Sequence, residues 1–177
     1  MKYLCSFLTL FVLSPLFAQK VEPTYKQVSY GPHKDMILNF WKIDSKKPTP
    51  LLVHIHGGGW LGGKKHETVG ASQLKQGYSY ASIDYRLAGT ELLPAAVHDA
   101  ARAIQFLRTK AKEWNFDPKR IAVTGGSAGA ASSMWLAYHD DMADPKSKDP
   151  VLRQSSRVCA AVAMGGQTTL DPFLLEK

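Results

Sequence analysis

The sequence predicts an α/β fold: a mainly parallel β-sheet with helices on both faces and an antiparallel hairpin at the N-terminal edge. Short apolar runs of strand length alternate with longer segments whose apolar residues recur at helical spacing, which is the pattern of β-α-β units. Two glycine-rich segments directly follow two of the short runs, where loops of such sheets carry chemistry. The 177 residues are enough for one domain with a sizeable core, and they contain no repeat or low-complexity segment.

The first 18 residues have the pattern of a secretory signal peptide. Met1-Lys2 supplies a positive start, the next residues up to Gln19 are uncharged, and Ala18 is a small residue suited to the position before cleavage. The apolar run is shorter than the roughly 20 residues that a membrane-spanning helix needs. We therefore expect residues 1–18 to be removed, and the mature protein to be secreted or periplasmic without a membrane anchor.

The charge pattern and the cysteine content argue against a nucleic-acid-binding protein and against a fold held by disulfides. The formal net charge is +7, but the lysines and arginines are dispersed among acidic residues, and no basic stripe is interleaved with aromatic residues. This pattern does not favour nucleic-acid binding. Cys159 is the only cysteine after the signal peptide, so no intrachain disulfide is expected. It lies in the apolar run 158–164, which predicts a small buried side chain rather than a nucleophile.

The first strands can be read in order. Residues 25–30 and 36–43 predict a hairpin joined by a turn with Gly31-Pro32-His33. Residues 51–56 form a short apolar run typical of a strand buried on both faces, and three glycines end it.

Helices and strands alternate in the rest of the chain. We expect a short helix over 67–76 closed by Gly77, a strand over 78–85, and a long amphipathic helix from Pro94 to Trp114. A buried strand over 120–124, a helix to about Tyr138, a polar loop over 140–156 and a last strand over 158–164 follow.

The strongest functional signal is Gly125-Gly126-Ser127-Ala128-Gly129, a G-x-S-x-G sequence between a predicted strand and a predicted helix. A serine on such a sharp turn projects its hydroxyl clear of the sheet, and glycine is needed two positions before and after it because backbones crowd there. The N-terminus of the following helix directs N–H groups and a positive dipole end toward a developing oxyanion. Without that context the pattern could be an ordinary tight glycine turn.

The second signal is His56-Gly57-Gly58-Gly59-Trp60, directly after another buried strand. Glycines let backbone N–H groups approach a substrate carbonyl closely. A flexible loop or a phosphate-binding loop is the alternative, but Gly62-Gly63-Lys64-Lys65 lacks the hydroxyl residue that a P-loop requires. The two motifs in this order are more specific than either alone.

Together these motifs resemble the esterase/lipase branch of the α/β-hydrolase superfamily, the hormone-sensitive-lipase-like and feruloyl- or acetyl-esterase-like proteins with an HGGG loop. The segments 83–87 (IDYRL), 94–99 (PAAVHD) and 114–121 (WNFDPKRI) also match, and the resemblance spans roughly residues 25–172. It implies a serine carboxylic-ester hydrolase that acts through an acyl-enzyme and needs no metal or organic cofactor. Acetyl or feruloyl esters on polysaccharide, or small acyl esters, are the implied substrates.

The same resemblance implies a role for each motif residue. Ser127 is the nucleophile, and the N–H groups of Gly58, Gly59 and Ala128 form the oxyanion hole. His56, Gly57, Gly125 and Gly129 shape the two loops, with His56 bracing its loop rather than acting as a base. Trp60 and Leu61 either border the acyl pocket or belong to the core.

The acid and the base of a catalytic triad are not evident. In this superfamily they follow the nucleophile in the order Asp or Glu, then His. The only later histidine is His139, which at about 1.5 Å per helical residue lies some 18 Å from Ser127. Asp171 is a weak candidate for the acid. We expect residues 19–177 to be a partial α/β-hydrolase domain, with two further strands bearing the acid and the base beyond Lys177.

The other histidines give weaker signals. His54 and His56 lie two apart on one strand like a metal-binding pair, but no third ligand is evident, so no metal site is expected. His98 and Asp99 are helix neighbours that do not face each other. His33 and His66 lie in turn or loop contexts and are expected at the surface without partners.

Two other functions stay open at this point. A non-catalytic binding protein could keep the serine turn without a triad, and a serine peptidase could use the same fold. The sequence does not indicate an oligomeric state.

Overall fold

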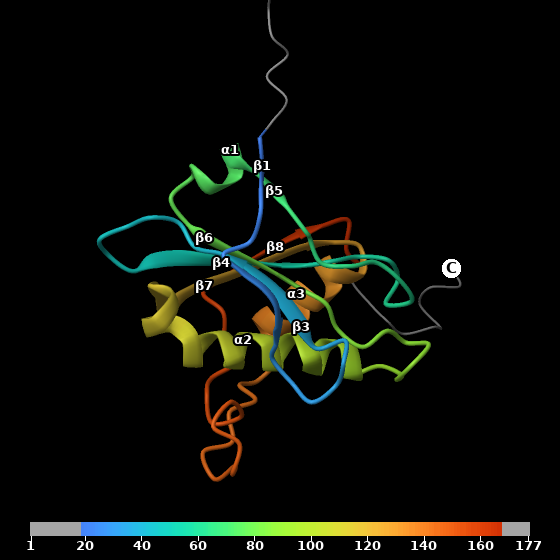
Figure 1. Ribbon diagram of the computed structural model, residues 1–177. Helices are drawn as coiled ribbons and strands as arrows, with labels where there is room; N and C mark the ends of the chain where they lie inside the picture. Colours follow the sequence, from blue (N-terminus) through green and yellow to red (C-terminus); the bar gives the residue numbers. More distant parts are fainter. Residues whose placement is uncertain (1–18, 168–177) are drawn as a thin grey trace, which may run out of the picture.

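The computed structural model describes residues 19–167. Its centre is a six-stranded sheet with strand order β2-β3-β6-β4-β7-β8 (Figure 1). These strands are β2 (Tyr25–Ser29), β3 (Ile37–Trp41), β4 (Thr49–Ile55), β6 (Ser79–Ile83), β7 (Phe116–Gly126) and β8 (Ala160–Met164). Strands β6, β4, β7 and β8 run parallel, whereas β2 and β3 are antiparallel at one edge. The predicted α/β fold and its N-terminal hairpin are confirmed.

The two faces of this sheet are covered unequally. The long helices α2 (Ala95–Trp114) and α3 (Ala128–Tyr138) lie on one face and contact each other (Figure 1). The opposite face carries the short helix α1 (Ala71–Leu74) and a two-stranded sheet of β1 (Lys20–Val21) and β5 (Val69–Gly70). Helices therefore occur on both faces, but only one face has long ones.

The main core lies between the sheet and α2 and α3. Alternate residues of β4, Leu51, Val53 and Ile55, point to this side and are at most 1% exposed. Ile104 and Leu107 of α2 pack into the same cluster, which follows from their spacing of three on one helix face. A smaller cluster of Trp41, Val69 and Tyr80 fills the opposite face. This apolar layering fixes the ends of β4 and β7 relative to each other.

The segment 67–76 differs from its predicted helix. Only four residues, 71–74, are helical, and Val69-Gly70 pair instead with Lys20-Val21. The Ala71 N–H donates to the Gln19 carbonyl, so the pairing with the distant N-terminal segment takes up backbone groups that a longer helix would use. Gly77 follows with a φ of 87°.

The burial predicted for Cys159 is wrong, because its side chain is exposed. The strand that follows it, β8, pairs with β7 alone among the described strands, and four of its five residues are exposed. An apolar sequence therefore occupies an open edge of the sheet in the described part of the chain. No helix within residues 19–167 is both long and apolar enough to cross a membrane. The expected signal peptide lies outside the described residues.

Candidate active site

The turn between β7 and α3 places Ser127 at the carboxyl end of the sheet. Its backbone has a φ of 53° and a ψ of −122°, which is a sparsely populated conformation for a residue other than glycine. The Ser127 N–H donates to the Met164 carbonyl at 3.0 Å, and its carbonyl accepts the Ala131 N–H at 3.0 Å. The side chain is exposed. The sheet and the helix thus fix the backbone of this serine while leaving its hydroxyl accessible.

Close backbone contacts explain the glycines around Ser127. A Cβ atom at Gly125 would lie 2.5 Å from the Ile55 carbonyl oxygen, and one at Gly129 would overlap the same oxygen. A Cβ at Gly57 would lie 2.7 Å from the carbonyl oxygen of Gly126. These approaches bring the first turn of α3 and the end of β7 directly against the end of β4.

The HGGG segment extends from the end of β4 beside this turn. Strands β4 and β7 are parallel neighbours, with Ile55 opposite Gly125, so both loops leave the sheet at the same edge. Gly58, Gly59 and Trp60 all have positive φ values, of 101°, 62° and 59°. The N–H groups of Gly58 and Gly59 make no hydrogen bond within the described residues, nor does that of Ala128. Unused backbone donors thus lie on both sides of Ser127.

Trp60 fixes the far side of this loop. Its side chain is buried, and the indole N–H donates to the Ser132 hydroxyl on α3 at 3.1 Å. Its carbonyl accepts the Ala88 N–H at 2.7 Å. Leu61 is 72% exposed. The structure therefore places Trp60 in the core and Leu61 at the surface.

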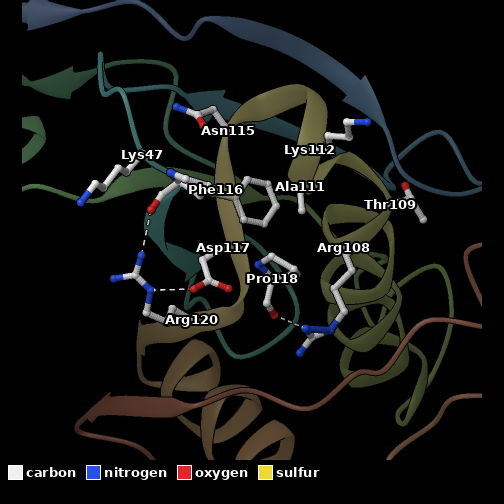
Figure 2. A pocket seen from close by; sticks show the side chains of 11 residues that line it. Lys47, Arg108, Thr109, Ala111, Lys112, Asn115, Phe116, Asp117, Pro118 and Arg120 are labelled. Atoms are coloured by element: carbon white, nitrogen blue, oxygen red, sulfur yellow. Dashed lines mark hydrogen bonds and ion pairs between the residues drawn. The ribbon is translucent and has the colours of Figure 1, made fainter.

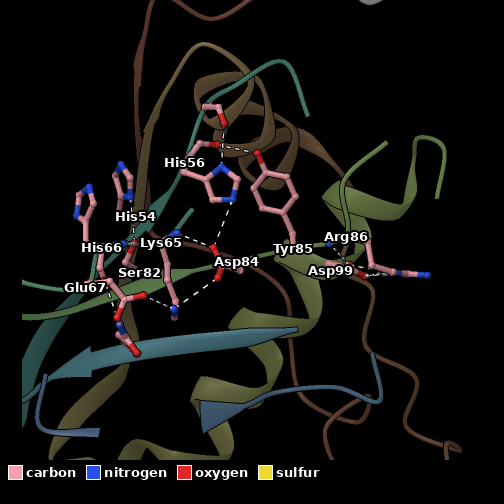
Figure 3. Close-up of polar contacts among 12 residues, drawn as sticks. His54, His56, Lys65, His66, Glu67, Ser82, Asp84, Tyr85, Arg86 and Asp99 are labelled. Carbon is pink, nitrogen blue, oxygen red and sulfur yellow. Dashed lines mark hydrogen bonds and ion pairs between the residues drawn. The ribbon is translucent and has the colours of Figure 1, made fainter. Parts of the chain in front are cut away.

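His56 is enclosed behind the loop (Figure 3). Its Nδ1 lies 2.8 Å from the Gly57 carbonyl, which can only accept, so Nδ1 carries the proton of this hydrogen bond. The Tyr85 ring stacks on the imidazole at 4.2 Å between centroids, and the Tyr85 hydroxyl donates to the His56 carbonyl. Burial lowers the pKa of His56, against a smaller raising effect of the Gly57 hydrogen bond and of Asp84. The buried Nε2 has no hydrogen-bond partner within the described residues.

His54 points to the other face of the sheet from Leu51 and Val53, away from the loops. It stacks on His66 with 4.1 Å between ring centroids, and its Nδ1 lies 3.2 Å from the Ser82 hydroxyl. His66 also bonds the Tyr80 hydroxyl at 3.0 Å. The expectation that His66 is a surface residue without a partner is therefore wrong. The reason is that the backbone of His66 is bonded to this face of the sheet: its N–H donates to the Ser82 hydroxyl and its carbonyl accepts the Asn39 side-chain amide.

The remaining candidates do not approach Ser127. His139 follows the last residue of α3, where it is exposed and stacks on Trp135. Asp99 is 1% exposed and pairs with Arg86 at 2.6 Å rather than with its neighbour His98. Asp171 lies outside the described residues. Residues 19–167 contain no cluster of three side chains suited to a metal ion.

A cavity of about 780 Å³ lies at the opposite end of β7 from Ser127 (Figure 2). Phe116 and Ala111 are buried in its floor, while Lys47, Lys112 and Arg120 stand around it. The Arg120 guanidinium binds Asp117 and the Pro48 carbonyl, and so belongs to local structure. The cavity is lined by residues from the start of β7, whereas Ser127 follows the last residue of this strand, Gly126.

Sequence patterns did not single out the polar residues that hold the HGGG segment. Lys65 lies in a Gly-Lys stretch without a clear pattern, and Asp84 and Tyr85 appeared only as part of a matching segment. The one available signal is that Asp84 directly follows a buried strand at the edge where the loops gather.

The fold, the strand–serine–helix turn and the adjoining glycine loop are those of an α/β-hydrolase. The chain belongs to the BD-FAE family, whose family model matches residues 40–174.

The curated relatives and the solved structures that resemble this chain are named as esterases or ester hydrolases. The carboxylesterase NlhH of Mycobacterium tuberculosis is 37% identical over 101 residues, which cover 55% of this chain and 32% of that protein. The probable carboxylic ester hydrolase LipM of the same species is 30% identical over 162 residues, covering 84% of this chain and 37% of that protein. The chain thus spans about a third of the length of these relatives.

Among solved structures, an acetyl ester-xyloside bifunctional hydrolase from Caldicellulosiruptor lactoaceticus is 32% identical with a TM-score of 0.61. The match covers 72% of this chain and 47% of that one. The apo form of Thermogutta terrifontis esterase 2, at 23% identity and a TM-score of 0.62, shows the shared fold over 84% of this chain and 60% of that one.

Proposed function

We propose that this chain provides the nucleophile and the oxyanion hole of a serine carboxylic-ester hydrolase. The observation that carries the proposal is the backbone of Ser127, with its φ of 53° at an exposed strand-to-helix turn. Such a conformation is costly and persists at sites where function requires it. The unused N–H groups of Gly58, Gly59 and Ala128 beside it are donors of the kind that bind an oxyanion.

The chemistry follows from this arrangement. The Ser127 Oγ attacks the carbonyl carbon of the ester, and its proton passes to a histidine base. The carbonyl oxygen becomes an anion that the three N–H groups bind, and the C–O bond to the alcohol then breaks as the histidine protonates the leaving oxygen. Water attacks the acyl-enzyme in the second half of the reaction, releasing the acid and restoring the serine.

The base and its carboxylate are proposed to come from the chain after the described residues. In this superfamily the acid and the histidine follow the nucleophile in chain order. His139 at the end of α3 does not meet the requirement, because a base must lie within hydrogen-bond reach of the serine hydroxyl.

The proposed substrates are small acyl esters or esters carried on polysaccharide. The acetyl ester-xyloside hydrolase among the relatives supports an acetylated carbohydrate. Together with the signal-peptide pattern of residues 1–18, this favours a secreted or periplasmic site of action.

The test is hydrolysis of p-nitrophenyl acetate by the full-length gene product and by Ser127→Ala. We expect the substitution to reduce kcat by about 10⁴-fold or more, which is typical of losing a nucleophile. Ser72→Ala, which removes an exposed serine of α1 on the opposite face, is the matched control. Equal rates for wild type and Ser127→Ala would contradict the serine mechanism. A folded wild type without activity on any ester would favour the non-catalytic binding protein.

A further inference from the structure

A charged cluster around the buried Lys65 side chain lies directly behind the HGGG loop, with Asp84 15% and Glu67 50% exposed (Figure 3). The Lys65 side chain is only 2% exposed, and its Nζ lies 2.8 Å from Glu67 and 3.5 Å from Asp84. The Asp84 carboxylate also accepts the backbone N–H of Lys65 at 2.5 Å. The oxygen that accepts this N–H, Oδ1, also lies 3.6 Å from Nε2 of His56, whereas Oδ2 faces the Lys65 Nζ. One carboxylate thus faces both ends of the loop, at residues 56 and 65.

Asp84 is itself rigidly placed. Its backbone N–H donates to the Ile37 carbonyl at 2.9 Å, and its carbonyl accepts the Tyr30 hydroxyl at 2.5 Å. The following residues continue the support, because Tyr85 stacks on His56 and the Ala88 N–H binds the Trp60 carbonyl. The segment after β6 therefore contacts the start, the middle and the end of the loop.

Stability alone gives little reason for this cluster. A buried ion pair loses about as much free energy on leaving water as it regains by attraction, and apolar packing often stabilises a core equally well. Charged groups can instead fix the orientation of the backbone that they bind, because an N–H that donates to a carboxylate has a narrow range of directions. The loop between these two ends has three consecutive residues with positive φ values, and so needs to be fixed from outside.

We propose that Asp84 is a positioning residue for the oxyanion hole: by binding Lys65 and facing His56, it fixes the direction of the Gly58 and Gly59 N–H groups. This inference rests on the proposed esterase function. Asp84 touches neither substrate nor Ser127 and acts through the loop.

The role predicts a specific kinetic change. Oxyanion donors act on the transition state more than on the bound ester, so misdirecting them lowers kcat and leaves KM nearly unchanged. The loss of one complete donor costs about 10²–10³ in rate. We expect Asp84→Ala to lower kcat by about 10²-fold, and Asp84→Asn by less, because the amide oxygen can still accept the Lys65 N–H.

The experiment uses the full-length gene product and p-nitrophenyl acetate. Rates are expressed per active site, counted by stoichiometric labelling with an organophosphate, so that a loss of folded protein does not count as a loss of rate. Hydrogen exchange of the peptide covering residues 57–65 is measured on the same samples, and we expect it to quicken in Asp84→Ala. Asp117→Asn is the matched control, because Asp117 likewise accepts a backbone N–H and pairs with an arginine, but at the far end of β7.

The outcomes separate the two proposals. If Ser127→Ala abolishes hydrolysis while both Asp84 variants keep kcat per active site within about twofold of wild type, the positioning role is wrong and the esterase proposal stands. An equal loss of kcat in Asp84→Asn and Asp117→Asn would also overturn it, because it would indicate a general effect of lost ion pairs. If Ser127→Ala leaves the rate unchanged, the esterase proposal itself fails. Should Asp84→Ala not fold, the nearly isosteric Asp84→Asn carries the test.

Discussion

At the scale of single residues, Ser127 combines accessibility with backbone strain. A residue with a Cβ atom at a φ of 53° and a ψ of −122° costs of order 1–3 kcal/mol, whereas glycine adopts such conformations readily. Replacing the serine with alanine keeps the strain, and replacing it with glycine removes it.

We therefore predict that Ser127→Gly is more stable than Ser127→Ala by about 1 kcal/mol, after allowing for the greater freedom of glycine in the unfolded chain. Urea unfolding followed by circular dichroism measures the difference. An alanine variant at least as stable as the glycine variant would show that the turn is not strained.

His54 makes the stability of the fold depend on pH. Burial, with smaller effects of His66 and His56, lowers the pKa of His54 to about 4. The unfolded chain binds a proton at this residue near its ordinary value of about 6.5. Between pH 6.5 and pH 4 the unfolded state thus holds more protons, so the free energy of unfolding falls as the pH falls.

We predict that the urea midpoint of the wild type falls as the pH is lowered from 6.5 to 4. In His54→Gln the midpoint should fall less steeply over the same range. Part of the slope remains in the variant, because burial also lowers the pKa values of His56 and His66. Identical slopes in the two proteins would contradict the assignment to His54.

Single residues also show what the sequence could and could not predict. The residues of the two glycine motifs were found because their spacing reflects local backbone geometry. The partners of His66 and the exposure of Cys159 depend on which strand lies at an edge and which segment folds over a face. Such facts come from contacts between residues far apart in sequence, and local patterns do not contain them. The same holds for Asp84, whose partner Lys65 lies 19 positions away.

At the scale of elements, α3 crosses the end of β4 so closely that only glycine fits at the crossing point. A Cβ atom at Gly129 would overlap the carbonyl oxygen of Ile55 and lie 2.8 Å from that of His56. Both oxygens belong to backbone that cannot move without separating β4 from β7.

We predict that Gly129→Ala destabilises the protein by more than about 3 kcal/mol, well beyond an ordinary substitution. Gly89→Ala is the control, because a Cβ atom there meets nothing within 4 Å. Urea unfolding of both variants is the measurement, and similar midpoints for the two would show that the crossing can relax.

The elements themselves were largely predictable. The long helix 95–114 and the strand–serine–helix unit match the periodic sequence, because each buries one regular face. The helix expected over 67–76 was mostly wrong, since Val69 and Gly70 pair with the N-terminal segment. A short amphipathic segment has too little helical preference of its own to resist such pairing.

At the scale of the whole molecule, the described sheet ends in an exposed strand. Within residues 19–167, β8 pairs only with β7, and Val162 and Met164 are 56% and 60% exposed. Open strand edges and exposed apolar side chains favour association between chains.

We predict that the 177-residue chain self-associates and that Val162→Lys reduces this association, because a lysine on an edge strand opposes pairing with a second chain. Sedimentation velocity at several protein concentrations measures it. A wild-type chain that stays monomeric at high concentration would contradict the prediction.

The pairing of β4 with β7 has a consequence for how the protein folds. Leu51 lies opposite Ile121, 70 positions along the chain, and the two glycine loops meet only once this register has formed. Contacts between such distant segments form slowly, because the chain must first close a long loop. A nascent chain that has made β4 but not yet β7 therefore has a glycine loop with no serine turn beside it. The two parts of the proposed oxyanion hole therefore come together only when β4 pairs with β7.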